Sequence, residues 1–221
     1  MDSDVIDGLD STKLIVLGGC VSPSIRYFGP CPDLSTETKV FDPVEDKFTE
    51  SEAMPNLRYR AAAVNVSNHI YMFGGRDLED SLVCGVDRYD VVTETWTTLD
   101  STQTENCFSD HWGVANDDNT IFLFGGWNAN YEAQNTTVMV TINGDELSFS
   151  TTSPMMQKRG DHVCTRFLDT DDVYCMGGFF DDSTNSAGYT LLSSVEHFDM
   201  GTKVWSAKSP MVTGRADFAL G

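Results

Sequence analysis

Four short apolar runs, each followed by two glycines, organise the hydrophobic pattern of the chain. Most residues in these runs are β-branched or aromatic, and each run is too short for a helix, so the pattern predicts buried strands. The runs are residues 14–17, 70–73, 121–124 and 173–176. The glycine pairs that end them are Gly18-Gly19, Gly74-Gly75, Gly125-Gly126 and Gly177-Gly178. The pairs recur at a period near fifty residues, which predicts an internally repeated all-β architecture.

Other landmarks repeat in the same register. An aromatic residue is followed by aspartate and, seven residues after the aromatic residue, by a second aromatic residue; the pairs are Phe41 and Phe48, Tyr89 and Trp96, and Phe198 and Trp205. In the third unit Ile142 takes the first aromatic position and Phe149 keeps the spacing. An arginine follows ten residues later in three units, as Arg58, Arg159 and Arg215, with Asn106 at that spacing in the second unit. Agreement at several landmarks indicates a true repeat.

The repeat defines the expected organisation of the chain. We expect units at about 13–57, 58–105, 106–158 and 159–214, and a final strand at 215–221. Residues 1–12 are acidic and have turn composition, so we expect a flexible tail there.

The double glycine, the aromatic-Asp step and the later tryptophan resemble the kelch repeat over about residues 13–221. This resemblance implies a β-propeller in which each unit is one blade of four antiparallel strands. Blades bury their apolar faces by stacking around an axis. In such a fold the four glycine pairs allow close backbone approach, and Trp96 and Trp205 supply packing area between blades.

The order of strands leaves two architectures open. The chain begins on the glycine-ending strand, whereas every later unit has a strand before it. In one reading, residues 216–221 pair beside residues 14–17 and close a four-bladed ring. In the other, the chain forms an open partial propeller. We favour the open arc, because the family usually has six or seven blades.

Charge and composition limit the classes of partner that the protein can bind. The net charge is −20, from 34 acidic and 14 basic residues. Such a surface repels nucleic acid and anionic membranes, since both are bound through Lys and Arg. The first residues lack the basic and apolar segments of a secretion signal, so the sequence favours a cytoplasmic location. The expected partner is another protein.

The six cysteines have no CxxC spacing, which argues against a zinc site and a dense disulfide scaffold. If residues 168–171 form a tight hairpin turn, Cys164 and Cys175 fall opposite each other on adjacent strands. In a reducing compartment the two would be buried apolar thiols rather than a disulfide.

No catalytic motif emerges from the sequence. It lacks a GxSxG nucleophile motif and a phosphate-binding glycine loop, and its four histidines are dispersed. His111 and His162 occupy equivalent places, each after an aspartate, and we interpret them as structural residues of the repeat. We expect no cofactor and no metal. The alternative is a metal-dependent catalytic propeller of the oxidase or lyase type.

A non-catalytic interaction scaffold is therefore the favoured function. Arg58, Arg159 and Arg215, one per unit, are candidates for binding an acidic peptide, although the favoured role is to anchor turns by bonding carbonyls of the neighbouring blade. The irregular loops supply the other candidate contacts, because loops on a rigid scaffold often carry specificity. Their aromatic candidates are Trp127, Tyr131, Phe180 and Tyr189.

Overall fold

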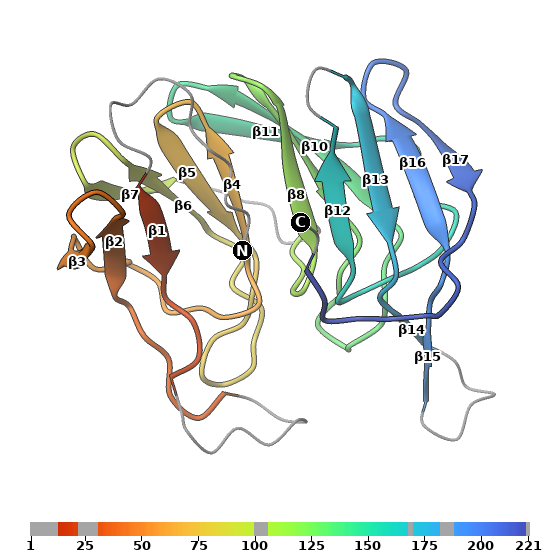
Figure 1. Ribbon diagram of the computed structural model, residues 1–221, viewed down its shortest axis with the longest axis horizontal. Helices are drawn as coiled ribbons and strands as arrows, with labels where there is room; N and C mark the ends of the chain where they lie inside the picture. The colour runs from red at the N-terminus through yellow and green to blue at the C-terminus, as the bar shows by residue number, and fades with distance from the viewer. Residues whose placement is uncertain (1–12, 22–30, 100–105, 168–169, 182–187, 220–221) are drawn as a thin grey trace.

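The computed structural model describes residues 13–21, 31–99, 106–167, 170–181 and 188–219. The expected tail at 1–12 lies outside these residues. The described part is all-β and contains no helix, so it offers none that could span a membrane. Its strands form four antiparallel blades that stand side by side in sequence order (Figure 1).

The second blade contains β4 (Ala62–Val66), β5 (His69–Phe73), β6 (Val86–Asp90) and β7 (Thr95–Leu99). The third contains β8 (Trp112–Asp117), β9 (Thr120–Phe124), β10 (Thr137–Asn143) and β11 (Glu146–Thr151). The fourth contains β12 (Val163–Arg166), β13 (Asp172–Met176), β16 (Val195–Asp199) and β17 (Val204–Lys208). A separate hairpin, β14 (Phe179–Asp181) and β15 (Tyr189–Leu191), projects from the fourth blade (Figure 1).

The first blade has three strands, β1 (Leu14–Leu17), β2 (Thr38–Asp42) and β3 (Lys47–Glu50), in the order β1-β2-β3. Each of the other blades has an inner strand (β4, β8 or β12) beside the strand that corresponds to β1. In the first blade the C-terminal segment does not supply this inner strand, since residues 215–219 form no strand. That segment bonds to the fourth blade instead, where the Asp217 N–H donates to the Asp161 carbonyl at 3.1 Å. The described residues therefore form an open arc. Leu220 and Gly221, which belonged to the expected final strand, lie outside them.

Strand register explains the seven-residue aromatic spacing. Tyr89 lies directly opposite Trp96, and Phe198 lies opposite Trp205, so each pair spans a hairpin. Their ring centroids are 5.1 and 4.9 Å apart, within the range of favourable aromatic packing. In the third blade Phe149 lies opposite Val140 rather than Ile142. The seven-residue spacing does not mark a cross-strand pair there, because this hairpin is longer than those of the other three blades.

The core lies between neighbouring blades. One cluster, which includes Phe73, Ile121 and Val140, joins blades two and three, and another, which includes Phe124 and Phe198, joins blades three and four. The tryptophans add hydrogen bonds across the same boundaries. Trp96 Nε1 donates to Thr38 Oγ1 of the first blade, and Trp205 Nε1 donates to Thr137 Oγ1 of the third, both at 2.9 Å. Both tryptophans therefore contact the preceding blade.

All six cysteines form disulfides, and the expectation of free thiols is wrong. Cys164 and Cys175 are directly opposite on β12 and β13, as the predicted hairpin requires, and they are bonded. The other bridges, Cys20–Cys31 and Cys84–Cys107, each join a loop that follows a glycine pair to residues further along the chain. Loop pairings of this kind depend on how irregular segments fold, so cysteine spacing could not reveal them.

Candidate functional site

Four repeat-equivalent residues form a linked series around the axis. Three of them lie two residues before β4, β8 and β12, and the fourth holds the same repeat position in the C-terminal segment. Arg60, Asp110, Asp161 and Asp217 all adopt left-handed backbone conformations, with φ between 51° and 59°. The Asp110 N–H donates to the Arg60 carbonyl at 2.9 Å, and the Asp161 N–H donates to the Asp110 carbonyl at 3.2 Å. The bond from Asp217 to Asp161 continues the series. Aspartate suits these positions because it tolerates the left-handed region better than most residues.

The side chains of this axial cluster (Arg60, Asp110, Asp161 and Asp217) line a cavity of about 190 Å³. Arg60 Nε lies 3.6 Å from Asp110 Oδ1, while Asp110 Oδ2 is buried and has no hydrogen-bond partner in the described part of the chain. Burial and the nearby Asp161 carboxylate raise the pKa of Asp110 well above its ordinary value, and the same two causes raise the pKa of Asp217. One guanidinium therefore faces three carboxyl groups, and the cluster favours an added positive charge.

Replacing Asp110 should stabilise the protein at neutral pH. A carboxyl group whose pKa is raised on folding stabilises the folded state at pH values below its unfolded-state pKa. This stabilisation is lost as the pH rises through the folded-state pKa. For Asp110→Asn we expect Tm to rise by about 2–4 °C at pH 7, the shift that roughly 1 kcal/mol produces in a chain of this size. The gain should disappear as the pH falls toward 3.8, the ordinary carboxyl pKa.

The matched control is Asp46→Asn, because Asp46 is exposed and has nearly the same backbone conformation, with φ of 50°. Calorimetry between pH 3.5 and 7.5 measures both variants. A lower Tm for Asp110→Asn at pH 7, or an equal rise in the control, contradicts a repulsive axial cluster.

Trp127 joins the axial cluster to the projecting hairpin. Its Nε1 donates to Asp161 Oδ2 at 2.7 Å, and its ring packs edge-on against Tyr189, with centroids 5.6 Å apart. Trp127 itself is buried, whereas Tyr189 and Leu191 are exposed. Phe180 is half-buried in β14. The aromatic candidates of the two loops are thus brought to one face, and the exposed members are on the hairpin.

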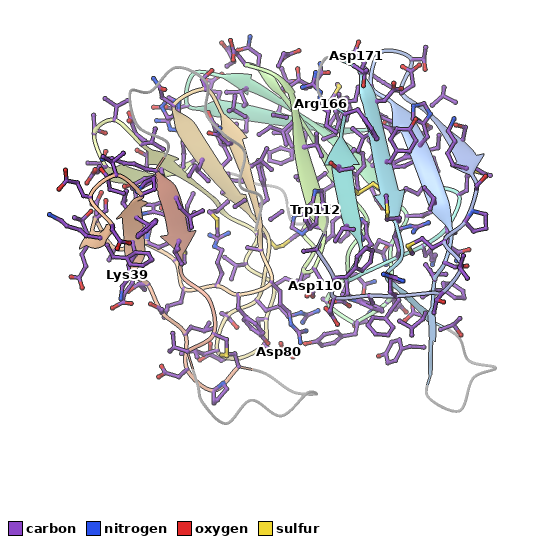
Figure 2. All side chains as sticks on the ribbon, in the orientation of Figure 1. Lys39, Asp80, Asp110, Trp112, Arg166 and Asp171 are labelled. Atoms are coloured by element: carbon purple, nitrogen blue, oxygen red, sulfur yellow. A yellow bond between two sulfur atoms is a disulfide. The ribbon has the colours of Figure 1, made fainter. Side chains whose placement is uncertain are left out.

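Tyr131 belongs to a second network on the same face, centred on Asp80. Tyr59 donates to Asp80 Oδ1 at 2.9 Å, and Tyr131 donates to the other carboxylate oxygen. The buried Arg76 guanidinium lies 3.7 Å from the Tyr131 ring centroid and donates to the Asn128 carbonyl at 2.8 Å. Asp80 and Asp110 lie at the same end of the blades, the end from which the hairpin projects (Figure 2). We call this end the loop face.

Sequence reasoning missed Arg76, which fixes the loops of blades two and three to each other. The only signal was its place directly after Gly74-Gly75, where the other units have Cys20, Trp127 and Phe179. Because those residues share no chemistry, the repeat pattern gave no reason to select arginine.

Two of the three repeat-equivalent arginines form buried ion pairs inside their own blades. Arg58 is buried, and its guanidinium lies 2.5 Å from Asp87 of β6 and donates to the Gly74 and Gly85 carbonyls. Arg159 is likewise buried and lies 2.5 Å from Glu196 of β16. Both arginines bond carbonyls as an anchoring role requires, but these carbonyls belong to their own blade rather than to the neighbouring one. Neither guanidinium is on the surface for a peptide. Arg215 is exposed and lies 6.0 Å from the Phe218 ring centroid.

The repeat positions explain why Arg215 is exposed, whereas Arg58 and Arg159 are buried. Lys39 occupies in β2 the register position that Asp87 occupies in β6, so a closed four-bladed ring would bring Arg215 to a lysine. In the third blade the structural equivalents are Phe108 and Val138, an apolar pair in the shared core. Phe108, rather than Asn106, holds the arginine position because its carbonyl accepts from Gly75 as Arg159 does from Gly126. The buried arginine and its acidic partner are therefore both present in the second and fourth blades, and both are replaced by apolar residues in the third.

The two histidines pack between blades. His111 and His162 lie against Gly74 and Gly125 of the preceding blades, the place that Phe218 takes beside Gly177. Burial lowers the pKa of His111 to about 4 and that of His162 well below its ordinary value, so both are neutral. Among the described residues, His162, Cys164 and Cys175 form a group whose potential ligand atoms lie within 4.8 Å of one another.

Comparisons with known proteins agree with this geometry. The attractin/LZTR1 β-propeller family model matches residues 31–217. An F-box/kelch-repeat protein of Arabidopsis thaliana is 32% identical over 91 residues, which cover 40% of this chain and 24% of that protein. A solved structure titled "Structure of YjhT" superimposes with a TM-score of 0.65 at 17% identity, and covers 82% of this chain and 61% of that one.

The solved structure shows likeness of fold alone at this level of identity. The chain spans about a quarter of the curated relative and less than two thirds of the solved chain. The family match covers most of the sequence and coincides with the blades described above. By that match, the chain belongs to the attractin/LZTR1 β-propeller family, whose architecture is of the kelch type.

Proposed function

We propose that the protein is a non-catalytic interaction scaffold whose loop face binds a basic segment of a partner protein. The observation that carries this proposal is the axial cluster, in which three carboxyl groups share one guanidinium beside exposed apolar residues of a projecting hairpin. A Lys or Arg side chain would supply the missing charge, and Tyr189 and Leu191 would pack against its apolar neighbours.

Rigid support for such a surface comes from the loop contacts. The Trp127 bond to Asp161 and the Asp80 network hold the loops in place, which lowers the entropy lost when a partner binds. The overall charge of −20 also favours encounter with a basic surface.

The three disulfides bear on where this binding would occur. Disulfides persist in oxidising compartments and are rare in the cytosol. We therefore include an oxidising compartment in the proposal, in place of the cytoplasmic location favoured by the sequence.

Binding can be tested with two synthetic twelve-residue peptides, one containing lysine, arginine and leucine and the other with glutamate replacing each basic residue. Fluorescence anisotropy with the intact chain should detect the basic peptide only. The combined variant Asp217→Asn/Leu191→Ser should weaken that binding about tenfold or more, which corresponds to about 1.4 kcal/mol.

The control variant Asp46→Asn/Val204→Ser changes the same residue types or sizes at exposed sites away from the loop face. It should bind the basic peptide as the unchanged protein does. Equal weakening in both variants would mean that the peptide follows net charge rather than the loop face, and absence of binding to the basic peptide would also reject the proposal.

A further inference from the structure

A buried histidine lies beside the Cys164–Cys175 disulfide. His162 precedes Cys164 by two residues, so alternation along the chain places the two on the same side of the blade. Cys175 lies directly opposite Cys164 on the neighbouring strand. One ring nitrogen of His162 and both sulfurs lie within 4.8 Å of one another. The three residues therefore form a compact group, which we call the HCC group.

The imidazole of the HCC group is buried without any partner. His162 is 3% exposed, and neither ring nitrogen has a hydrogen-bond partner among the described residues. Leaving a buried polar atom unpaired destabilises the folded state. His111, at the equivalent place, keeps a hydrogen bond from one nitrogen to the Phe108 backbone. The unpaired ring therefore calls for an explanation that packing alone does not give.

Equivalent blades show that packing does not require these side chains. Ala61 and Phe218 occupy the place of His162 in the sequence repeat. By strand register, Ala63 and Met72 occupy the places of Cys164 and Cys175 in the second blade. Gly113 and Leu123 occupy them in the third. The fold tolerates apolar residues at all three places, so the HCC group is a feature of the fourth blade.

We propose that reduction of the Cys164–Cys175 disulfide converts the HCC group into a binding site for Zn²⁺. A dithiol reductant supplies two electrons and two protons, giving two Cys thiols and the oxidised, disulfide form of the reductant. Zn²⁺ then binds the two thiolates, releasing both thiol protons, and accepts the lone pair of the neutral His162 ring. Oxidation by another disulfide reverses the change and releases the ion. The group would thus hold either a disulfide or a metal.

Charge and ligand chemistry favour zinc at this position. Two thiolates and a neutral imidazole balance the charge of Zn²⁺, so the buried complex carries no net charge. Thiolate and imidazole are the usual ligands of zinc, at about 2.3 Å for sulfur and about 2.0–2.1 Å for nitrogen. Separations of ligand atoms in such a site fall within the 4.8 Å that already encloses the group. His162 also lines the axial cavity, which gives the ion a route from the loop face.

Cobalt(II) provides the direct test, because thiolate ligands give it a strong charge-transfer absorption. The intact protein is reduced with dithiothreitol, freed of reductant under nitrogen and titrated with Co²⁺, and Zn²⁺ is then added to displace it. Reduced protein should show the thiolate band at one equivalent, whereas oxidised protein should not. Zn²⁺ should raise Tm only in the reduced state, since ligand that binds the folded state stabilises it.

Matched variants locate the site. His162→Phe introduces the residue found at Phe218, and His111→Phe makes the same change in the third blade. His162→Phe should weaken Co²⁺ binding by at least tenfold, since changes outside the ligand shell of a metal already cost 10–100-fold. His111→Phe should bind as the unchanged protein does.

The double variant Cys164→Ser/Cys175→Ser should lose the band while keeping the other four cysteines. A band that survives this change, or one unaffected by His162→Phe, would place the metal elsewhere and overturn the proposal. Circular dichroism reports whether each variant folds. Should one fail to fold, reduction of the unchanged protein still tests the proposal, because absence of a thiolate band after reduction overturns it.

Discussion

Replacement of Arg58 by methionine is expected to lower the free energy of unfolding by about 3–5 kcal/mol, the usual cost of removing one partner from a buried ion pair. The reason is local. Arg58 is 1% exposed and Asp87 is fully buried, so the variant leaves a carboxylate in the interior without its guanidinium. Two backbone carbonyls, of Gly74 and Gly85, also lose their donor. Urea denaturation, followed by tryptophan fluorescence, measures the change.

The chain supplies the controls for this experiment. Arg215→Met changes the repeat-equivalent but exposed arginine, and should alter stability by less than about 0.5 kcal/mol. The third blade has Phe108 and Val138 in place of the ion pair, so the double variant Arg58→Phe/Asp87→Val should recover at least half of the loss. Equal effects of Arg58→Met and Arg215→Met would show that burial of the pair does not determine its contribution.

Equivalent positions in the blades show how far the sequence alone predicts the architecture. The glycine pairs, the aromatic pairs and the tryptophans were found by spacing because each repeats at a fixed register in the blades. The spacing rule fails at two places: the longer hairpin of the third blade moves Ile142 out of register, and the arginine position falls on Phe108 rather than on Asn106. A fixed offset cannot follow such insertions, whereas hydrogen bonding identifies Val140 and Phe108 directly.

Function was harder to predict because the loop face depends on contacts between units. The sequence favours Trp127 as a binding residue, whereas in the structure it is buried and donates to Asp161. Asp110 and Asp161 lie just before inner strands, and Asp217 holds the same repeat position, yet nothing local in the sequence indicates that they converge. Their convergence comes from blade stacking and from backbone bonds that link one unit to the next. Sequence spacing reports the repeat unit and carries little information on what the units form together.

Substitution of Gly74 by alanine is the second large effect that we expect. Gly74 has φ of +61°, a conformation that costs an L-residue about 1–2 kcal/mol. A Cβ there would also lie 2.0 Å from the Phe108 carbonyl oxygen of the next blade. Since that carbonyl is backbone and accepts from Gly75, it cannot move without breaking the contact between blades. The total loss should exceed about 4 kcal/mol, a size reserved for such severe changes.

Gly144→Ala separates the two causes. Gly144 has φ of +64°, but a Cβ there meets nothing within 4 Å. In this variant only the left-handed backbone conformation is unfavourable, so the free energy of unfolding should fall by about 1–2 kcal/mol. The difference between the variants, measured by urea denaturation, is the cost of separating blades two and three at the glycine pair. If both variants lose the same stability, the first glycine is needed for its backbone conformation alone. If Gly74→Ala loses more, the glycine pairs mark where one blade closes on the next, and this contact would account for their place in every unit.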